Sequence, residues 1–283
     1  MEVVVADQAG FCFGVQRALR MAEKALEKRP RIASLGPLIH NRQVVERLAQ
    51  RGLEVVNEVS EVDCGCALVR SHGAPPEVYE EAAARGIELL DATCPFVARA
   101  QSAAVALLDE DYEVVFLGEA HHPETVGIVA RTGKRAHVVE NPAEADELPL
   151  GKRVGVVAQT TQRLDRLQDL VARLLGRVEE LKVHNTICKA TASRQQAALA
   201  LAERADVMIV VGGHHSANTS RLAELCRQTD APTWHIETAA EIDPAWVAQA
   251  RVVGVTAGAS TPDEAIAEVC ARLTALSETA PTS

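Results

Sequence analysis

Aromatic residues are scarce in this chain, and long apolar runs are absent. Only 3% of the 283 residues are aromatic while 47% are hydrophobic, so a buried core has to consist mainly of alanine, valine and leucine. No apolar stretch approaches the roughly 20 residues that span a bilayer, and the opening Met-Glu-Val-Val-Val has no basic segment ahead of a long apolar one. We therefore expect a soluble cytoplasmic protein with no membrane partner.

Basic residues are also in the minority. Lys plus Arg number 29 against 39 for Asp plus Glu, which gives a net charge of -10. This balance argues against nucleic acid as a partner, because phosphate backbones are bound by clustered cations. An anionic small molecule stays compatible with the sequence, because local groups determine such a site.

The seven cysteines do not have the pattern of a disulfide framework, because their number is odd and they are widely spaced. Closely spaced three-cysteine runs, as in radical enzymes, are absent, and the glycines at 212–213 begin no G-x-G-x-x-G fingerprint. We expect thiols or metal ligands in a reducing compartment. Four cysteines are expected to be small buried hydrophobic residues, although the first two could also chelate a metal: Cys64, Cys66, Cys226 and Cys270.

One local pattern occurs three times along the chain. In each copy a short apolar run leads to a cysteine, and a helical pattern begins directly after it; the three cysteines are Cys12, Cys94 and Cys188. At 28 residues beyond each cysteine, a polar residue follows an apolar run and a glycine: His40, His122 and Ser216. A further polar turn in each third contributes His72, Thr160 and Ser260. The sequence therefore predicts three copies of one structural unit.

Short Val, Ile and Leu runs alternate with helical patterns throughout, which predicts an α/β fold with parallel sheets flanked by helices. We expect three pseudo-repeated lobes at residues 1–94, 95–187 and 188–276, with the N-terminal strand packing with another lobe. Residues 277–283 are small and polar, and we expect a frayed tail.

Ligands of open parallel sheets gather beyond the carboxyl ends of the strands. If the three lobes pack about a pseudo-threefold axis with those ends inward, the three thiols converge. Structural zinc sites usually use ligand pairs two to four residues apart, whereas these cysteines are 82 and 94 residues apart. A cubane iron-sulfur cluster with three thiolates and an open fourth iron fits better, and that iron can act as a Lewis acid on a substrate oxygen.

The surrounding side chains suit a phosphate or diphosphate, especially at helix N-termini. This set comprises His40, His72, His122, Thr160, Ser216, Asn218 and Ser260. The alternative for the histidines is a capping or core role, and for the hydroxyl residues a helix N-cap.

Glu124 is a carboxylate two residues after His122. In a dry pocket beside a diphosphate a carboxyl pKa should rise, which makes Glu124 a candidate proton donor. The alternative is an acidic residue that only favours the helix dipole.

Six ordered motifs resemble the 4-hydroxy-3-methylbut-2-enyl diphosphate reductase family of the non-mevalonate isoprenoid pathway. They are Gly-Phe-Cys-Phe-Gly-Val, Asp-Ala-Thr-Cys-Pro, His-Pro-Glu, Gln-Thr-Thr, Thr-Ile-Cys-Lys-Ala-Thr and Val-Thr-Ala-Gly-Ala-Ser. The resemblance runs from about Val3 to Leu276. One departure is Ala217, where family members commonly have a second serine.

The resemblance implies a three-lobed trefoil around one 4Fe-4S cluster held by Cys12, Cys94 and Cys188. It assigns diphosphate binding to His40, His72, His122, Ser216, Asn218 and Ser260. Thr160 and Glu124 would serve the substrate hydroxyl and proton delivery. The implied reaction is a reductive removal of that hydroxyl, with ferredoxin or flavodoxin as the electron donor.

Two other functions remain open at the level of sequence. A cluster-dependent hydro-lyase would use an open iron without consuming electrons. A non-enzymatic protein would use the three cysteines to hold a structural zinc ion.

Overall fold

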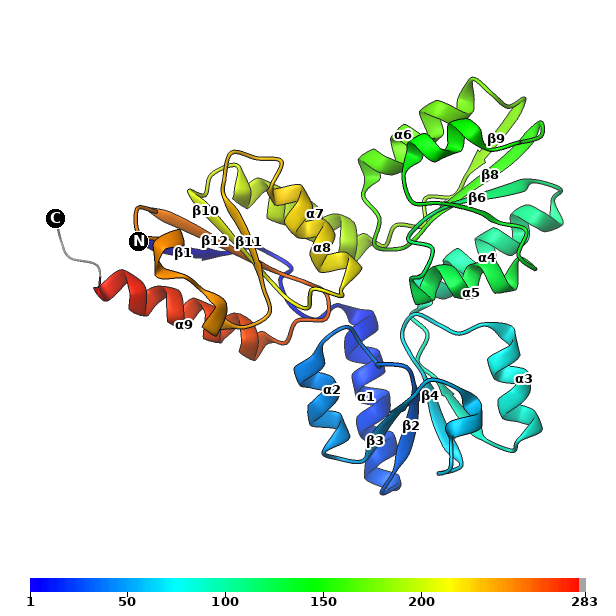
Figure 1. Ribbon diagram of the computed structural model, residues 1–283, viewed down its shortest axis with the longest axis horizontal. Coiled ribbons are helices and arrows are strands. Elements are labelled where there is room, and N and C mark those ends of the chain that lie inside the picture. Colours follow the sequence, from blue (N-terminus) through cyan, green and yellow to red (C-terminus); the bar gives the residue numbers. More distant parts are fainter. Residues whose placement is uncertain (280–283) are drawn as a thin grey trace. The chain divides into compact units, whose positions relative to one another are not determined.

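The computed structural model describes residues 1–279. Its strands form three parallel four-stranded sheets, and each sheet has helices on both faces (Figure 1). The strand orders are β3-β2-β4-β5, β7-β6-β8-β9 and β11-β10-β12-β1, so one order occurs three times. The predicted fold class is therefore confirmed. Among these residues no helix has the length and apolar character needed to cross a membrane.

The first sheet contains β2 (Ile32–Leu35), β3 (Leu53–Val56), β4 (Cys66–Val69) and β5 (Glu88–Asp91). Its helices are α1 (Phe13–Lys28), α2 (Arg42–Ala49) and α3 (Pro76–Ala84), with a 3-10 turn η1 (Val59–Glu61). Side chains alternate across the strands, and Ala33, Leu35, Ala67 and Val69 pack with Ala82 of α3.

The second sheet contains β6 (Glu113–Leu117), β7 (His137–Val139), β8 (Arg153–Ala158) and β9 (Glu180–Val183). Its helices are α4 (Pro95–Asp109), α5 (Pro123–Arg131), α6 (Leu164–Leu175) and the 3-10 helix η2 (Pro142–Glu147). One face of the sheet packs on α6, and the other face packs on α4 and α5.

The third sheet contains β10 (Val207–Val211), β11 (Thr233–Ile236), β12 (Val252–Ala257) and the N-terminal strand β1 (Glu2–Val5). Its helices are α7 (Lys189–Ala202), α8 (Ala217–Cys226), α9 (Asp263–Thr279) and the 3-10 turns η3 (Ala239–Glu241) and η4 (Pro244–Trp246). Helices α7 and α8 pack on one face, and α9 packs on the other. The N-terminal strand β1 is thus the edge strand of a sheet whose other strands come from the C-terminal third of the chain.

In each sheet a glycine turn follows the strand that is second in the strand order, which is β2, β6 or β10. The N–H groups of Gly36, Gly118 and Gly212 donate to the last residue of the neighbouring strand, at 2.7, 3.0 and 2.8 Å. Gly212 adopts a φ of 145°, a conformation that residues with a Cβ rarely adopt. The polar residues at 40, 122 and 216 follow these turns at one fixed offset.

The core consists of small and branched aliphatic residues, as the composition predicts. Phe116 and Tyr112 are buried aromatic residues among the described residues, and most other core positions hold Ala, Val or Leu. Burial of such side chains stabilises the fold by roughly 25 cal/mol per Å² of apolar surface.

The chain forms two compact units. The first unit comprises Met1–Phe13, His40–Val44 and Lys189 onward, and the second comprises Gly14–Ile39 and Val45–Cys188. The first unit holds one sheet and the second unit holds two. The lobe boundaries 1–94, 95–187 and 188–276 stay a prediction. Helix α9 extends to Thr279, beyond the expected start of the frayed tail, and the rest of that tail lies outside the described residues.

Candidate functional site

Each of the three predicted cysteine ligands lies directly before a helix. Helices α1, α4 and α7 begin at the residue after Cys12, Cys94 and Cys188 respectively. A helix N-terminus has unpaired N–H groups and the positive end of the helix dipole, an environment that suits an anionic ligand. All three cysteines are partly exposed.

The backbone of each cysteine is bound to the turn after a sheet strand. Cys12 N donates to Ala259 O at 3.0 Å, Cys94 N to Ser71 O at 2.9 Å and Cys188 N to Thr160 O at 3.0 Å. These carbonyls follow β12, β4 and β8, which are the third strands of the three sheets. The three thiols therefore occupy one equivalent position in the repeat.

The expectation that the four other cysteines are buried apolar residues is confirmed for Cys66 and Cys226, whereas Cys64 and Cys270 are only partly buried against the core. Cys226 is fully buried among alanine and leucine side chains, and burial raises the pKa of its thiol to about 11. Burial also raises the pKa of the Cys66 and Cys270 thiols, although Cys270 is only half-buried. Cys64 is half-buried too, and its thiol donates to Cys66 O at 3.3 Å. Such raised values disfavour the thiolate that a metal ligand requires.

Glu124 and Thr160 form a buried pair in the second unit. The Glu124 side chain is 1% exposed; its Oε1 accepts from Thr160 N at 2.7 Å and its Oε2 accepts from Thr160 Oγ1 at 2.8 Å. Helix α5 carries the carboxylate in its first turn, and the turn after β8 carries the threonine. The pair links a potential proton donor to a hydroxyl group.

His122 caps the helix that carries Glu124. Its Nδ1 accepts from Glu124 N at 3.2 Å, so in the neutral ring the proton lies on Nε2, which can donate to an anion. The rings of His122 and His72 contact edge to face, with centroids 5.3 Å apart. His121 is exposed and His122 is buried, so His122 is the inward member of this pair.

Ser216 and Asn218 lie at the N-terminus of α8 in the first unit. Ser216 Oγ accepts from Thr219 N at 3.4 Å, so this serine is a helix cap. Asn218 is 4% exposed, and its side-chain nitrogen and oxygen have no hydrogen-bond partner among the described residues. Buried polar groups in folded proteins are nearly always bonded, so this amide fits a ligand that completes its hydrogen bonds.

Ser260 and His40 are neighbours in the first unit. Ser260 Oγ donates to His40 O at 3.0 Å, which links the turn after β12 to the segment after β2. Ser260 is buried and His40 is partly buried.

The predicted residues are therefore distributed over both units. The first unit holds Cys12, His40, Ser216, Asn218 and Ser260, and the second holds His72, Cys94, His122, Glu124, Thr160 and Cys188.

Two supporting residues are not identified by the sequence reasoning. Gln159 is fully buried; its Oε1 accepts from Glu119 N at 3.0 Å and its Nε2 donates to Thr161 Oγ1 at 3.0 Å. Thr186 Oγ1 accepts from Ala158 N at 2.9 Å, which fixes the segment before Cys188. Both lie inside motifs in which a neighbouring residue is assigned, so their position in those motifs is the signal that could have found them.

Comparison with known proteins gives one result throughout. Residues 3–274 match the model of the LytB protein family. A 4-hydroxy-3-methylbut-2-enyl diphosphate reductase from Geobacter metallireducens is 50% identical over 96% of this chain and 97% of that protein. One from Pelobacter propionicus is 47% identical over 96% of this chain and 98% of that protein.

Two solved structures are similar. The E-1-hydroxy-2-methyl-but-2-enyl-4-diphosphate reductase from Plasmodium falciparum has a TM-score of 0.91 at 27% identity, over 96% of this chain and 88% of that one. A structure of (E)-4-hydroxy-3-methyl-but-2-enyl diphosphate reductase, described as the terminal enzyme of the non-mevalonate pathway, has a TM-score of 0.71 at 40% identity, over 97% of this chain and all of that one. With a family model that matches nearly its whole length, the chain belongs to the LytB protein family.

Proposed function

We propose that this chain reduces 4-hydroxy-3-methylbut-2-enyl diphosphate to isopentenyl and dimethylallyl diphosphates, the last step of the non-mevalonate isoprenoid pathway. The bond between carbon and the hydroxyl oxygen breaks, two electrons and two protons are consumed, and the oxygen leaves as water. The observation that carries the proposal is the buried Glu124–Thr160 pair in a chain whose relatives bear the name of this reductase.

Cys12, Cys94 and Cys188 would hold the iron-sulfur cluster that this reaction needs. Their equivalent positions at three helix N-termini and their partial exposure fit thiolate ligands. A four-iron cluster with three thiolate ligands supplies single electrons and an open iron that acts as a Lewis acid on the substrate oxygen.

The diphosphate would be bound by His40, His72, His122, Ser216, Asn218 and Ser260. Asn218 supports this role because its buried amide makes no hydrogen bond among the described residues. His122 supports it because its Nε2 carries a proton in the neutral ring. Helix N-termini at Ser216 and His122 add backbone N–H groups, which suit phosphate oxygens.

Proton delivery would run from Glu124 through Thr160. A protonated Glu124 Oε2 can donate to Thr160 Oγ1, and the threonine hydroxyl can pass its own proton to the leaving hydroxyl. Burial of the pair keeps bulk water from competing for this proton. The second bond, from Thr160 N to Oε1, holds the carboxyl group in one orientation.

Ferredoxin or flavodoxin would deliver the two electrons one at a time, and the reaction would take place in the cytoplasm. No nucleic acid or membrane is needed as a partner, in agreement with the net charge of -10.

The test is anaerobic turnover of the diphosphate substrate with and without dithionite-reduced methyl viologen. Isopentenyl and dimethylallyl products should form only when the reductant is present. Loss of the hydroxyl at an equal rate without reductant would establish a hydro-lyase instead. A colourless, zinc-loaded and inactive protein would support the structural-zinc alternative.

A further inference from the structure

The helix after each cysteine carries an arginine near its start. Arg17 and Arg99 lie five residues after Cys12 and Cys94, and Arg194 lies six residues after Cys188. The three arginines thus lie at similar but not identical places in the repeat, about one and a half helical turns from the cysteine.

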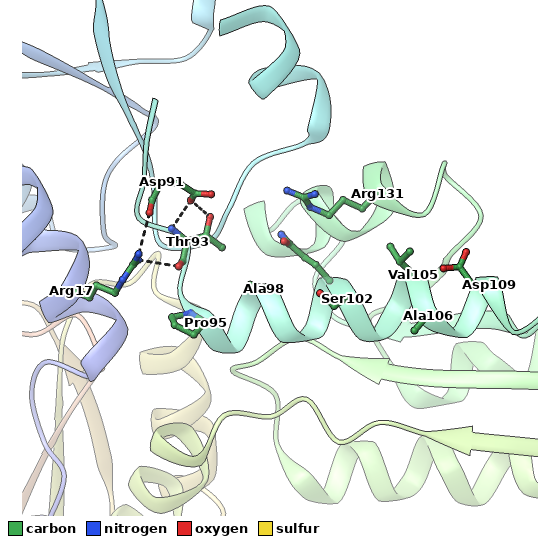
Figure 2. A pocket seen from close by; sticks show the side chains of 11 residues that line it. Arg17, Asp91, Thr93, Pro95, Ala98, Ser102, Val105, Ala106, Asp109 and Arg131 are labelled. Atoms are coloured by element: carbon green, nitrogen blue, oxygen red, sulfur yellow. Dashed lines mark hydrogen bonds between the residues drawn. The ribbon is translucent and has the colours of Figure 1, made fainter. Parts of the chain in front are cut away.

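Arg17 binds the segment that leads to the second cysteine. Its Nη1 donates to Thr93 O at 3.1 Å and its Nη2 donates to Asp91 O at 3.3 Å (Figure 2). Thr93 directly precedes Cys94, and its N–H donates to Asp91 Oδ1 at 2.8 Å. The Thr93 carbonyl lies between the end of β5 and the start of α4, and the Arg17 guanidinium donates a hydrogen bond to it there.

Arg99 binds the segment that leads to the third cysteine. Its Nη2 donates to Asn185 O at 2.8 Å, three residues before Cys188. Asn185 Oδ1 in turn accepts from Ile187 N at 3.1 Å. The arginine therefore holds a turn that ends at the cysteine.

Arg194 binds the segment that leads to the first cysteine. Its Nη2 donates to Gly10 O at 2.8 Å, two residues before Cys12, and the side chain is only 3% exposed. Gly10 has a φ of 95°, so the held carbonyl belongs to a turn that favours glycine.

The three links form a closed cycle along the chain. The helix after the first cysteine holds the segment before the second, the helix after the second holds the segment before the third, and the helix after the third holds the segment before the first. Hydrogen bonds from a charged donor are about twice as strong as those from a neutral one, so each link can fix a loop of a few residues.

We propose that Arg17, Arg99 and Arg194 are positioning residues that fix the backbone in front of each cluster cysteine, each acting on the next cysteine in the cycle. This assignment rests on the proposed function for its cluster, but the links themselves do not depend on it. Arg194 is buried, Arg17 is half-buried beside an open groove, and Arg99 is exposed. Because water screens and replaces exposed hydrogen bonds, the effects should decrease in that order.

Hydrogen–deuterium exchange on anaerobically purified protein tests the links. Arg17→Met should speed exchange in the peptide that contains Cys94 and leave the peptide around Cys188 unchanged. Arg99→Met should do the reverse, and Arg194→Met should act on the peptide around Cys12. Arg20→Met, at an exposed position of the same helix as Arg17, is the matched control and should change none of them.

Cluster retention and spectroscopy test the role of the links. Iron release to a ferrous chelator should be about tenfold faster in Arg17→Met than in the wild type, with an altered electron paramagnetic resonance spectrum of the reduced cluster. Arg17→Lys keeps the charge but cannot bind both carbonyls in fork geometry, so it should restore these properties only in part.

Each outcome decides a separate question. Exchange that rises uniformly, or only in the helix that carries the mutation, overturns the links. Exchange that follows the cycle while iron release and the spectrum stay unchanged makes the arginines purely structural and overturns their role toward the cluster. A wild type without iron and sulfide would refute the proposed function instead, and the exchange pattern would still decide whether the links exist. If Arg194→Met does not fold, the Arg17 and Arg99 variants decide.

Discussion

The second and third repeats place different chemistry at one equivalent position. Glu124 and Asn218 each lie two residues after a helix cap, which is His122 in one repeat and Ser216 in the other. Both side chains are buried, yet each carboxylate oxygen of Glu124 accepts a bond from Thr160, whereas the Asn218 amide has no partner among the described residues. The buried polar group of the second repeat is thus bonded within the protein, and we expect the substrate to complete the hydrogen bonds of the third.

Removal of the acid should have the largest effect. Glu124→Gln keeps the shape of the side chain but removes the transferable proton, so kcat should fall about 10²–10⁴-fold under anaerobic reducing conditions. The iron content and colour should match the wild type, because Glu124 is not a proposed cluster ligand. Normal turnover by this variant would show that the proton comes from another group.

Substitution of Asn218 in the third repeat should change mainly KM. In the proposed site Asn218→Leu would remove hydrogen bonds to a charged substrate, so KM should rise about 10–100-fold while kcat changes less. Steady-state kinetics with the diphosphate substrate measure this split. An unchanged KM would remove Asn218 from the substrate site.

The two repeats should also differ in the sign of their effect on stability. Thr160→Val deletes the hydroxyl that bonds Glu124 Oε2, so the free energy of unfolding of the substrate-free protein should fall by about 1–3 kcal/mol. Asn218→Leu removes an unbonded buried amide, so the same free energy should stay nearly constant or rise. Urea unfolding measures both, and an equal loss in the two variants would contradict the comparison.

The third repeat should be the more sensitive to pH. His235 Nε2 bonds Gly212 O at 2.8 Å beside the turn that leads to Ser216, and burial lowers the pKa of this imidazole. The unfolded chain therefore binds a proton more readily, so this contribution to stability is complete above the ordinary value of 6.5 and is lost as pH falls through the lowered pKa.

The matched residue in the second repeat is Val138, which does not titrate. His235→Gln should flatten the dependence of the unfolding free energy on pH below about 6.5. An identical acid profile in the variant would assign the dependence to other groups.

The smallest effect is expected at Ala217, the first residue of α8. Ala217→Ser adds one hydroxyl next to Ser216, and a single neutral hydrogen bond contributes about 1 kcal/mol, so KM should decrease by less than about fivefold. A large change in KM would mean that the missing hydroxyl has reorganised the diphosphate site.

The sequence predicts the regular elements well because their cores repeat simple apolar patterns. The strands at 113–117, 153–158 and 207–211 coincide with short apolar runs of the sequence, as the predicted α/β pattern requires. Helices α1, α4 and α7 begin directly after the three cysteines, as the repeated pattern predicts.

The bonding state of the site residues is not accessible from sequence. The spacing of the repeat relates Glu124 to Asn218 but does not predict their hydrogen bonds. The partner of Glu124 is Thr160, which lies 36 residues away in the chain, and the Asn218 amide has no partner among the described residues. The arginine links cannot be predicted from the sequence for the same reason, since Arg17 and Thr93 are 76 residues apart.

Mössbauer spectroscopy with iron and sulfide counting, on anaerobically purified protein with and without substrate, tests the central claim most directly. The account predicts about four irons and four sulfides per chain, with one distinct iron site whose signal changes when substrate is added. Zinc in place of iron, or iron sites that are all alike and insensitive to substrate, would contradict the assignment of Cys12, Cys94 and Cys188 to one open cluster.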